Sequence, residues 1–307
     1  MIQIYGAGVA GSFLYFLLSK KGLKVNIYDR RRAPDCRCAW GFIYDEAKEL
    51  YSKINVDLDE YVLVRPKNIF ANGFRFKNRS VVIVDKLSLL SDLWSGIEFR
   101  ESDSDIVVDA TGTKREFLPK IEEDRLMFTI QFLERHERDE DIFAYFERHG
   151  YAWAFPLGGK WHIGAGSAFE EKVPGLIKKL RALFDFPERE PECSCNAKVR
   201  MLPPSRCRPF ICGKVVGVGE AIGCVSGFGE GNVPALKSAE ILSECLDKLE
   251  IYERRILREF GWLEREQRFV GSFLRGKPAK YLLPSIIAFE RKRIAKISLL
   301  DFLRAML

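Results

Sequence analysis

Short apolar runs alternate along the chain with polar and glycine-rich turns, and their spacing predicts strands and helices. The chain opens on the apolar run Ile2–Tyr5, which is typical of a buried strand. Between Ser12 and Gly22 the apolar residues form one broad face with helical spacing, and Val25–Tyr28 is again short and apolar. This order of strand, helix and strand predicts the first unit of a parallel sheet with a helix packed on it.

The pattern changes in the middle of the chain. Further buried strands are expected at 105–109 and 214–217, each followed by a turn of small residues. The apolar pattern between these two strands predicts antiparallel strands. Earlier in the chain, Asn72-Gly73 predicts a hairpin turn inside the β-structure at 68–76. The expected antiparallel strands cover 125–135, 142–147, 151–156 and 160–166. Helices are expected at 46–53, 86–94, 170–184 and 233–249, and 251–307 is mostly amphipathic and helical.

Three glycines after the first strand predict a nucleotide site. Gly6, Gly8 and Gly11 stand at G-x-G-x-x-G spacing, with Ala10 between the last two. The first allows a tight turn, the second lets the backbone approach a pyrophosphate, and the third lets helix and strand pack closely. The start of the helix offers N–H groups and a positive dipole end to the phosphates. A glycine-rich turn in another kind of α/β protein is the alternative.

The ends of two strands add candidate cofactor contacts. Asp29 follows the second strand about twenty residues after the glycines, where a carboxylate can accept hydrogen bonds from both hydroxyls of an adenosine ribose. Arg30 begins a run of three arginines that predicts a solvated turn; a contact of one of these arginines with adenine or phosphate is the alternative, for which Arg30 is the candidate. The small-residue turn from Ala110 to Gly112 is placed to pass close to the cofactor.

A second glycine-rich segment comes late in the chain. Gly219 and Glu220 follow a strand, and Gly229, Gly231 and Asn232 come just before the next helix. Backbone N–H groups at that helix start are expected to face the far end of a cofactor. Because two such segments suit a long, extended molecule, FAD is favoured over NAD. A loop that merely packs tightly is the alternative.

These elements predict an α/β protein with a Rossmann-like FAD-binding domain, an antiparallel-sheet substrate domain and a helical C-terminal region. The FAD-binding domain is expected to be discontinuous and to comprise 1–60, 80–118 and 200–248. The substrate domain is expected to comprise 61–79 and 119–199, and the helical region 249–307.

Large aromatic rings alternate with alanines between Tyr151 and Pro156. On a strand, Tyr151, Trp153 and Phe155 share one face. That face is either packed on its own core or forms an aromatic wall beside an apolar ligand, and periodicity alone does not separate the two.

Composition excludes several classes of protein. The 307 residues are 47% hydrophobic and 30% charged with a net charge of +6, which predicts a soluble globular protein without a basic block for nucleic acid. No apolar run has the length of a membrane span, and the chain begins directly with a strand, so we expect a cytoplasmic protein. The abundance of Lys, Arg and Glu over Gln leans toward a thermophile. The amphipathic C-terminal region is expected to dock on the protein; contact with a membrane surface is the alternative.

Eight cysteines raise the question of metal binding. Four of them form Cys193-x-Cys195 and a later pair, Cys207 and Cys212. The C-x-C spacing is tighter than the usual structural zinc pattern, so no metal site is expected. Free thiols are expected for a cytosolic protein, with disulfides as the exception known from thermophiles.

Six segments match the motifs of one family of flavoproteins. They are the glycine motif through Asp29, Arg37-Cys38-Ala39-Trp40-Gly41, Asp109–Gly112, Tyr151-x-Trp153-x-Phe155-Pro156, and the glycine segments at 219–220 and 229–232. Through them the chain resembles the geranylgeranyl reductase family, within the group that shares the p-hydroxybenzoate hydroxylase fold. The family carries aspartate at the position of Glu220, and the stretch from Trp94 to Asp109 is shorter than in typical members.

The resemblance implies that C=C bonds of an isoprenoid lipid are reduced by hydride from reduced FAD. It implies cofactor contacts from Arg37, and it makes Cys38 the candidate catalytic residue, as a proton donor or as a redox-sensitive thiol with Cys36. The aromatic face formed by Tyr151, Trp153 and Phe155 would line an apolar substrate pocket.

The chain has no iron–sulfur motif and no second nucleotide domain. Electrons are therefore expected from a separate donor, either a ferredoxin-like protein or a reduced nicotinamide or deazaflavin. Two alternatives remain: a flavin-dependent monooxygenase, or a non-catalytic flavin- or lipid-binding protein.

Overall fold

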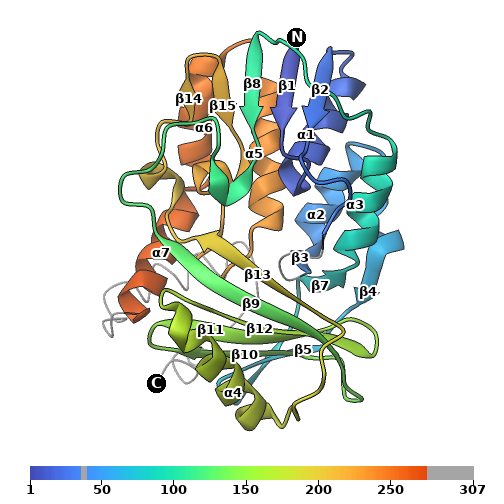
Figure 1. Ribbon diagram of the computed structural model, residues 1–307, viewed down its shortest axis with the longest axis vertical. Coiled ribbons are helices and arrows are strands. Elements are labelled where there is room, and N and C mark those ends of the chain that lie inside the picture. The colour runs from blue at the N-terminus through green and yellow to red at the C-terminus, as the bar shows by residue number, and fades with distance from the viewer. Residues whose placement is uncertain (36–39, 275–307) are drawn as a thin grey trace.

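Two sheets dominate the fold, and they lie one above the other in Figure 1. The computed structural model describes residues 1–35 and 40–274. The upper sheet is mostly parallel and carries helices, and the lower sheet is mostly antiparallel and carries one helix on its far side. The predicted α/β fold class, with a Rossmann-like part and an antiparallel-sheet part, is confirmed.

The upper sheet has five strands in the order β14-β15-β8-β1-β2. Their bounds are β1 Ile2–Tyr5, β2 Val25–Tyr28, β8 Ile106–Asp109, β14 Ile211–Cys212 and β15 Val215–Gly217. All pairs are parallel except β14 with β15. The carboxyl ends of four parallel strands therefore meet at one edge of the sheet, where ligands bind in folds of this kind.

Helices α1 (Val9–Lys20) and α5 (Asn232–Cys245) pack against each other beside this sheet. Their apolar side chains form one core with the sheet, and Ile4, Phe13 and Leu236 are fully buried. Both helices begin at the ligand edge, because each follows a glycine-rich turn there. The prediction placed the end of α5 four residues too late.

The lower sheet has seven strands in the order β13-β9-β12-β11-β10-β5-β6. Their bounds are β5 Asn68–Ala71, β6 Phe74–Lys77, β9 Leu126–Arg135, β10 Ile142–Glu147, β11 Gly150–Pro156, β12 Lys160–Ser167 and β13 Cys193–Arg200. Neighbours are antiparallel except β10 with β5. The far face carries α4 (Val173–Phe184), which buries Leu176 and Leu180 against it.

The lower sheet contains one hairpin turn that was predicted and one edge strand that was not. Asn72 and Gly73 have φ angles of +48° and +84°, so the predicted two-residue hairpin turn is confirmed. Strand β13 was not predicted. It lies at the edge of the sheet and is mostly exposed, so its sequence lacks the apolar alternation that would mark it.

A small sheet, β3-β7-β4, stands beside the ligand edge with helices around it. Its strands are β3 Gly41–Ile43, β4 Val62–Val64 and β7 Val81–Val84. The remaining α-helices are α2 Tyr44–Ser52, α3 Lys86–Ser95, α6 Tyr252–Glu259 and α7 Gly261–Leu274. Short 3-10 helices are η1 Leu58–Tyr61, η2 Gly112–Lys114, η3 Glu170–Lys172, η4 Pro204–Arg206, η5 Gly219–Ile222 and η6 Leu249–Ile251.

The helical prediction for 249–307 can be followed only as far as Leu274, and the rest lies outside the described residues. Within the described part of the chain, every helix is too short or too polar to cross a bilayer.

Candidate cofactor and substrate site

A cavity of about 920 Å³ lies between the ligand edge of the upper sheet and the near face of the lower sheet. It gathers nearly all the site residues predicted from the sequence. Those that line it are Gly6, Gly8, Ala10, Asp29, Arg30, Ala110, Gly112, Gly219, Glu220, Gly229, Gly231, Asn232, Tyr151, Trp153 and Phe155. Segments far apart in the sequence therefore form one continuous site.

The first glycine turn is shaped by close backbone contacts. A Cβ at Gly6 would come within 2.5 Å of the Ala110 oxygen, and one at Gly11 within 1.8 Å of the Gly6 oxygen. Gly11 thus packs strand against helix and does not line the cavity. Nothing lies within 4 Å of the corresponding point at Gly8. Gly8 therefore has open space beside it at the start of α1, where a pyrophosphate can approach.

Asp29 lies at the cavity wall but already has donors of its own. Its Oδ2 accepts hydrogen bonds from the Ala7 N–H (2.8 Å) and from Arg31 Nη2 (2.7 Å), and Oδ1 accepts from Arg31 N and Nε. Burial raises the pKa of Asp29, but hydrogen bonds from Arg31 and Ala7 outweigh it and hold the pKa below its usual value. These four donors occupy the acceptor sites of the carboxylate, so ribose hydroxyls can bind only where Arg31 gives way.

Arg30 points to a different neighbour. Its guanidinium lies 3.7 Å from a carboxylate oxygen of Glu116, and both side chains are about half exposed. Arg31, by contrast, joins Asp29 to Asp35 and lies 5.4 Å from the Trp94 ring centroid. Arg31 is therefore the more buried arginine of the run and the one that the sequence did not single out.

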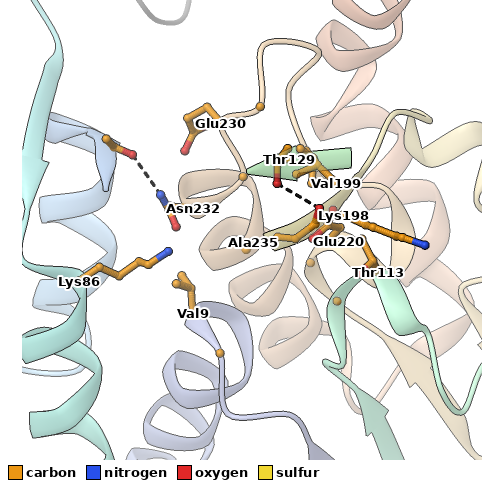
Figure 2. Close-up of a pocket in the computed structure, with 18 of the residues that line it drawn as sticks. Val9, Lys86, Thr113, Thr129, Lys198, Val199, Glu220, Glu230, Asn232 and Ala235 are labelled. Carbon is orange, nitrogen blue, oxygen red and sulfur yellow. Dashed lines mark hydrogen bonds between the residues drawn. The ribbon is translucent and has the colours of Figure 1, made fainter. Parts of the chain in front are cut away.

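The second glycine segment forms the start of α5. The Asn232 side chain donates to the Gly41 oxygen at 3.0 Å, which fixes strand β3 beside this helix start (Figure 2). Glu230 accepts a hydrogen bond from the Val233 N–H at 2.9 Å. These two hydrogen bonds tie the segment to β3 and to the first turn of α5. Helices α1 and α5 both begin at this wall of the cavity.

Glu220 is held by a buried arginine on the strand that the sequence missed. Its Oε1 accepts a hydrogen bond from the backbone N–H of Arg200 at 2.7 Å. The guanidinium of Arg200 donates to the backbone oxygens of Glu220 and Thr113 and to the Asp124 carboxylate. Arg200 is 1% exposed. Burial raises the pKa of Glu220 to about 7. The longer side chain at this position is therefore anchored to β13 and is a group that can change charge near neutral pH.

Lys86 is a cavity residue that the sequence did not predict. It begins α3 directly after Asp85, is 5% exposed, and lines the cavity. Figure 2 shows its ammonium directed toward Asn232, with Val9 at the start of α1 beside it. The starts of α1 and α5 and one lysine thus converge, which makes this part of the cavity favourable for an anion. Burial, together with the Lys86 charge, lowers the pKa of His162 to about 4.

The aromatic face lies on the cavity side of the lower sheet and touches the cofactor half at both ends. The Tyr151 hydroxyl lies against Gly229, and the Phe155 ring lies against Gly41. Between them, the indole of Trp153 covers Gly164 and donates to Gln131 at 3.2 Å. These rings therefore line the cavity, and Gly164 provides the space in which the Trp153 indole lies.

Two predicted residues lie outside the described residues: Arg37 and the candidate catalytic Cys38. Trp40 and Gly41, which end the same motif, are described; Trp40 is buried and packs edge-on against His162. In the described part of the chain no cluster of three or more His, Cys, Asp or Glu side chains has the arrangement of a metal site.

Comparisons place this architecture among flavoproteins. No protein-family model matches the chain. A curated relative, Uncharacterized protein MJ1182 of Methanocaldococcus jannaschii, is 27% identical over 89% of this chain and 92% of its own length. A geranylgeranyl bacteriochlorophyll reductase-like structure from Thermoplasma acidophilum matches with a TM-score of 0.75 at 15% identity, over 99% of this chain and 95% of that chain. A flavoprotein/dehydrogenase from Cytophaga hutchinsonii matches with a TM-score of 0.69 at 14% identity, over 94% and 92% of the two chains.

These likenesses confirm the predicted fold, which the chain shares with a geranylgeranyl bacteriochlorophyll reductase-like protein and with a flavoprotein/dehydrogenase. The residues present fit FAD as the cofactor. Gly8 leaves space at one helix start, Asn232 begins a second helix, and a single cavity joins the two. An extended dinucleotide needs this combination, because its phosphates and its ring system bind at separate places.

Proposed function

We propose that the protein is an FAD-dependent oxidoreductase that reduces C=C bonds of an isoprenoid chain of the geranylgeranyl type. The observation that carries the proposal is the contact of one aromatic face with both glycines at the flavin end, Tyr151 with Gly229 and Phe155 with Gly41. This contact supports the proposal because an apolar wall would then lie beside the position expected for the flavin ring.

Bound FAD supplies hydride, and the chain's own residues prepare the site for it. The phosphate groups are held by the start of α1 and by the charge of Lys86. The start of α5 stabilises negative charge at the flavin end. Tyr151, Trp153 and Phe155 hold an apolar chain and exclude water, which an isolated alkene requires because it is a poor electrophile.

A proton must reach the second alkene carbon, and Cys38 stays the candidate donor. We also propose that electrons come from a separate donor, a ferredoxin-like protein or a reduced nicotinamide or deazaflavin. Replacing Cys38 by Ser is expected to slow alkene reduction while FAD stays bound. Unchanged turnover would remove Cys38 from the reaction.

Anaerobic mixing of the dithionite-reduced protein with a geranylgeranyl lipid tests the proposal. Reoxidation of the flavin together with a saturated product detected by mass spectrometry supports it. Reoxidation only after O₂ is admitted, with hydroxylation of an added aromatic compound, would show a monooxygenase instead. Absence of both reactions in the FAD-loaded protein would show a binding protein without turnover, and a protein that takes up no FAD would contradict the proposal at its base.

A further inference from the structure

The register of the lower sheet places two alanines in line with Trp153. Ala144 pairs with Trp153 across β10 and β11, and Ala71 pairs with Ala144 across β5 and β10. Residues directly opposite each other on neighbouring strands share a face, so all three lie on the cavity side. Phe74 pairs with Ala71 across the hairpin and ends this row at the sheet edge, where it is 41% exposed.

Rows of large side chains run on both sides of the alanines. On one side Phe146 pairs with Tyr151, and the ring of Phe228 packs edge-on against Phe146 at 6.0 Å. On the other side Ile69 lies between Ile142 and Phe76. All of these residues except Phe74 line the cavity. The alanine row is therefore the floor of a trough with one apolar wall on the Ile69 side and, over β10 and β11, a second apolar wall formed by Phe146 and Tyr151.

These strands carry large side chains on their opposite face, so the strands themselves do not require alanine at positions 71 and 144. Phe70 and Phe143 directly precede the two alanines and stack at 5.2 Å on the side of α4. Large rings are thus accommodated on one face, while the cavity face carries only methyl groups at the neighbouring positions. The volume left above Ala144 and Ala71 belongs to the cavity.

The trough has a direction, a length and a chemical character. Along the row that lines the cavity it crosses two strand spacings, from β11 to β5, which is about 10 Å at about 4.8 Å each. The rows that form it, as described above, carry only apolar side chains apart from the Tyr151 hydroxyl at the flavin end. The polar side chains of Gln131 and Thr129 lie on the opposite side of Trp153. A flexible, unbranched or methyl-branched apolar chain fits this shape, whereas a polar chain would lose its hydration without replacement.

We propose that the substrate chain runs from the flavin end along this trough toward the hairpin tip, and that Ala144 and Ala71 determine how long a chain is accepted. The inference rests on the proposed function and adds to it the path of the chain and the residues that set chain length. Because Ala144 lies next to Trp153 and Ala71 lies one strand further out, the two positions meet different parts of the same chain.

The test uses the FAD-loaded protein and follows perturbation of the flavin spectrum by geranyl and geranylgeranyl chains. Ala71→Leu is expected to weaken geranylgeranyl binding by about tenfold or more and to leave geranyl binding unchanged, because several methylene groups of the longer chain lose their place. Ala144→Leu is expected to weaken both. Ala182→Leu, on the exposed side of α4, is the matched control and is expected to change neither.

The outcomes separate this inference from the proposed function. Equal effects of Ala71→Leu on the two chains, or no effect of either trough variant, would overturn the path. Chain-length effects without any alkene reduction would uphold the path and reject the reductase. If Ala71→Leu fails to fold, as judged by FAD content and melting temperature, Ala71→Val serves in its place with a smaller effect of the same selectivity.

Discussion

The hydroxyl of Tyr151 lies so close to Gly229 that a Cβ at this glycine would come within 2.3 Å of the phenol oxygen. Tyr151 belongs to the antiparallel sheet, and Gly229 to the glycine segment before α5. The contact joins the two halves of the molecule beside the start of α5. It leaves no room for any side chain at position 229, and Gly229 also has a φ of +86° that favours glycine.

Gly229→Ala is expected to lower FAD affinity and the melting temperature, because the methyl group must displace the Tyr151 ring and because alanine is strained at this φ. Tyr151→Phe in the same chain removes the oxygen and is expected to restore part of the loss. The strain at position 229 stays, so recovery should be incomplete. A double-mutant cycle on the dissociation constant of FAD measures the coupling, which we expect to be on the order of 1 kcal/mol. Additive effects would mean that the contact does not matter.

Lys86→Met is expected to weaken FAD binding by about 10- to 100-fold, because a buried ammonium beside the start of α1, where the phosphates are expected, would be lost. Riboflavin lacks the phosphates, so its affinity should change little. Isothermal titration with both ligands, repeated at two salt concentrations, measures the difference.

Lys198→Met is the matched control for this experiment. Its ammonium points away from the cavity in Figure 2 and lies 4.8 Å from the Phe128 ring centroid. We expect it to bind FAD as the parent chain does. Equal losses for riboflavin and FAD in Lys86→Met would assign Lys86 a purely structural role.

Local sterics explain why much of the fold and of the cofactor site could be predicted. Close backbone contacts leave no room for a side chain at Gly6 and Gly11. Positive φ angles favour the residue types found at the Asn72-Gly73 turn. Such local requirements can be recognised in the sequence because a single residue type, usually glycine, satisfies them. The motif residues that line the cavity could be predicted for the same reason.

What could not be predicted depends on distant pairing. Lys86 looks like an ordinary charged residue at a helix start, and only the tertiary structure buries it. Ala71 and Ala144 acquire meaning from strand register, which short apolar runs do not specify. Arg200 lies on β13, an exposed edge strand without apolar alternation, so neither the strand nor its anchoring of Glu220 could be recognised.

Asp29→Ala is expected to lower FAD affinity by about 100-fold and FMN affinity much less, because only FAD has the adenosine ribose that this carboxylate can bind once Arg31 gives way. Asp35→Ala breaks the other ion pair of Arg31 but keeps the Asp29 contact with the Ala7 N–H, so a smaller effect is expected. Fluorescence titration with both flavins measures the two ratios. A ratio of FMN to FAD affinity that is the same in the parent and Asp29→Ala would show that Asp29 does not face the ribose.

Glu220 is expected to make stability depend on pH. Its pKa is about 7 in the folded protein because of burial, against an ordinary value near 4.5. Between these values the folded state keeps a proton that the unfolded chain has lost, so the contribution of Glu220 to the free energy of unfolding is fully present below about pH 4.5 and falls as the pH rises to about 7.

Glu220→Gln keeps an oxygen for the Arg200 N–H and cannot ionise. The variant should therefore gain stability relative to the parent over this window, by up to about 3 kcal/mol. Urea unfolding at several pH values measures the gain, with Glu122→Gln on the surface as the matched control. A difference between variant and parent that does not change with pH would show that folding leaves the pKa of Glu220 at its ordinary value.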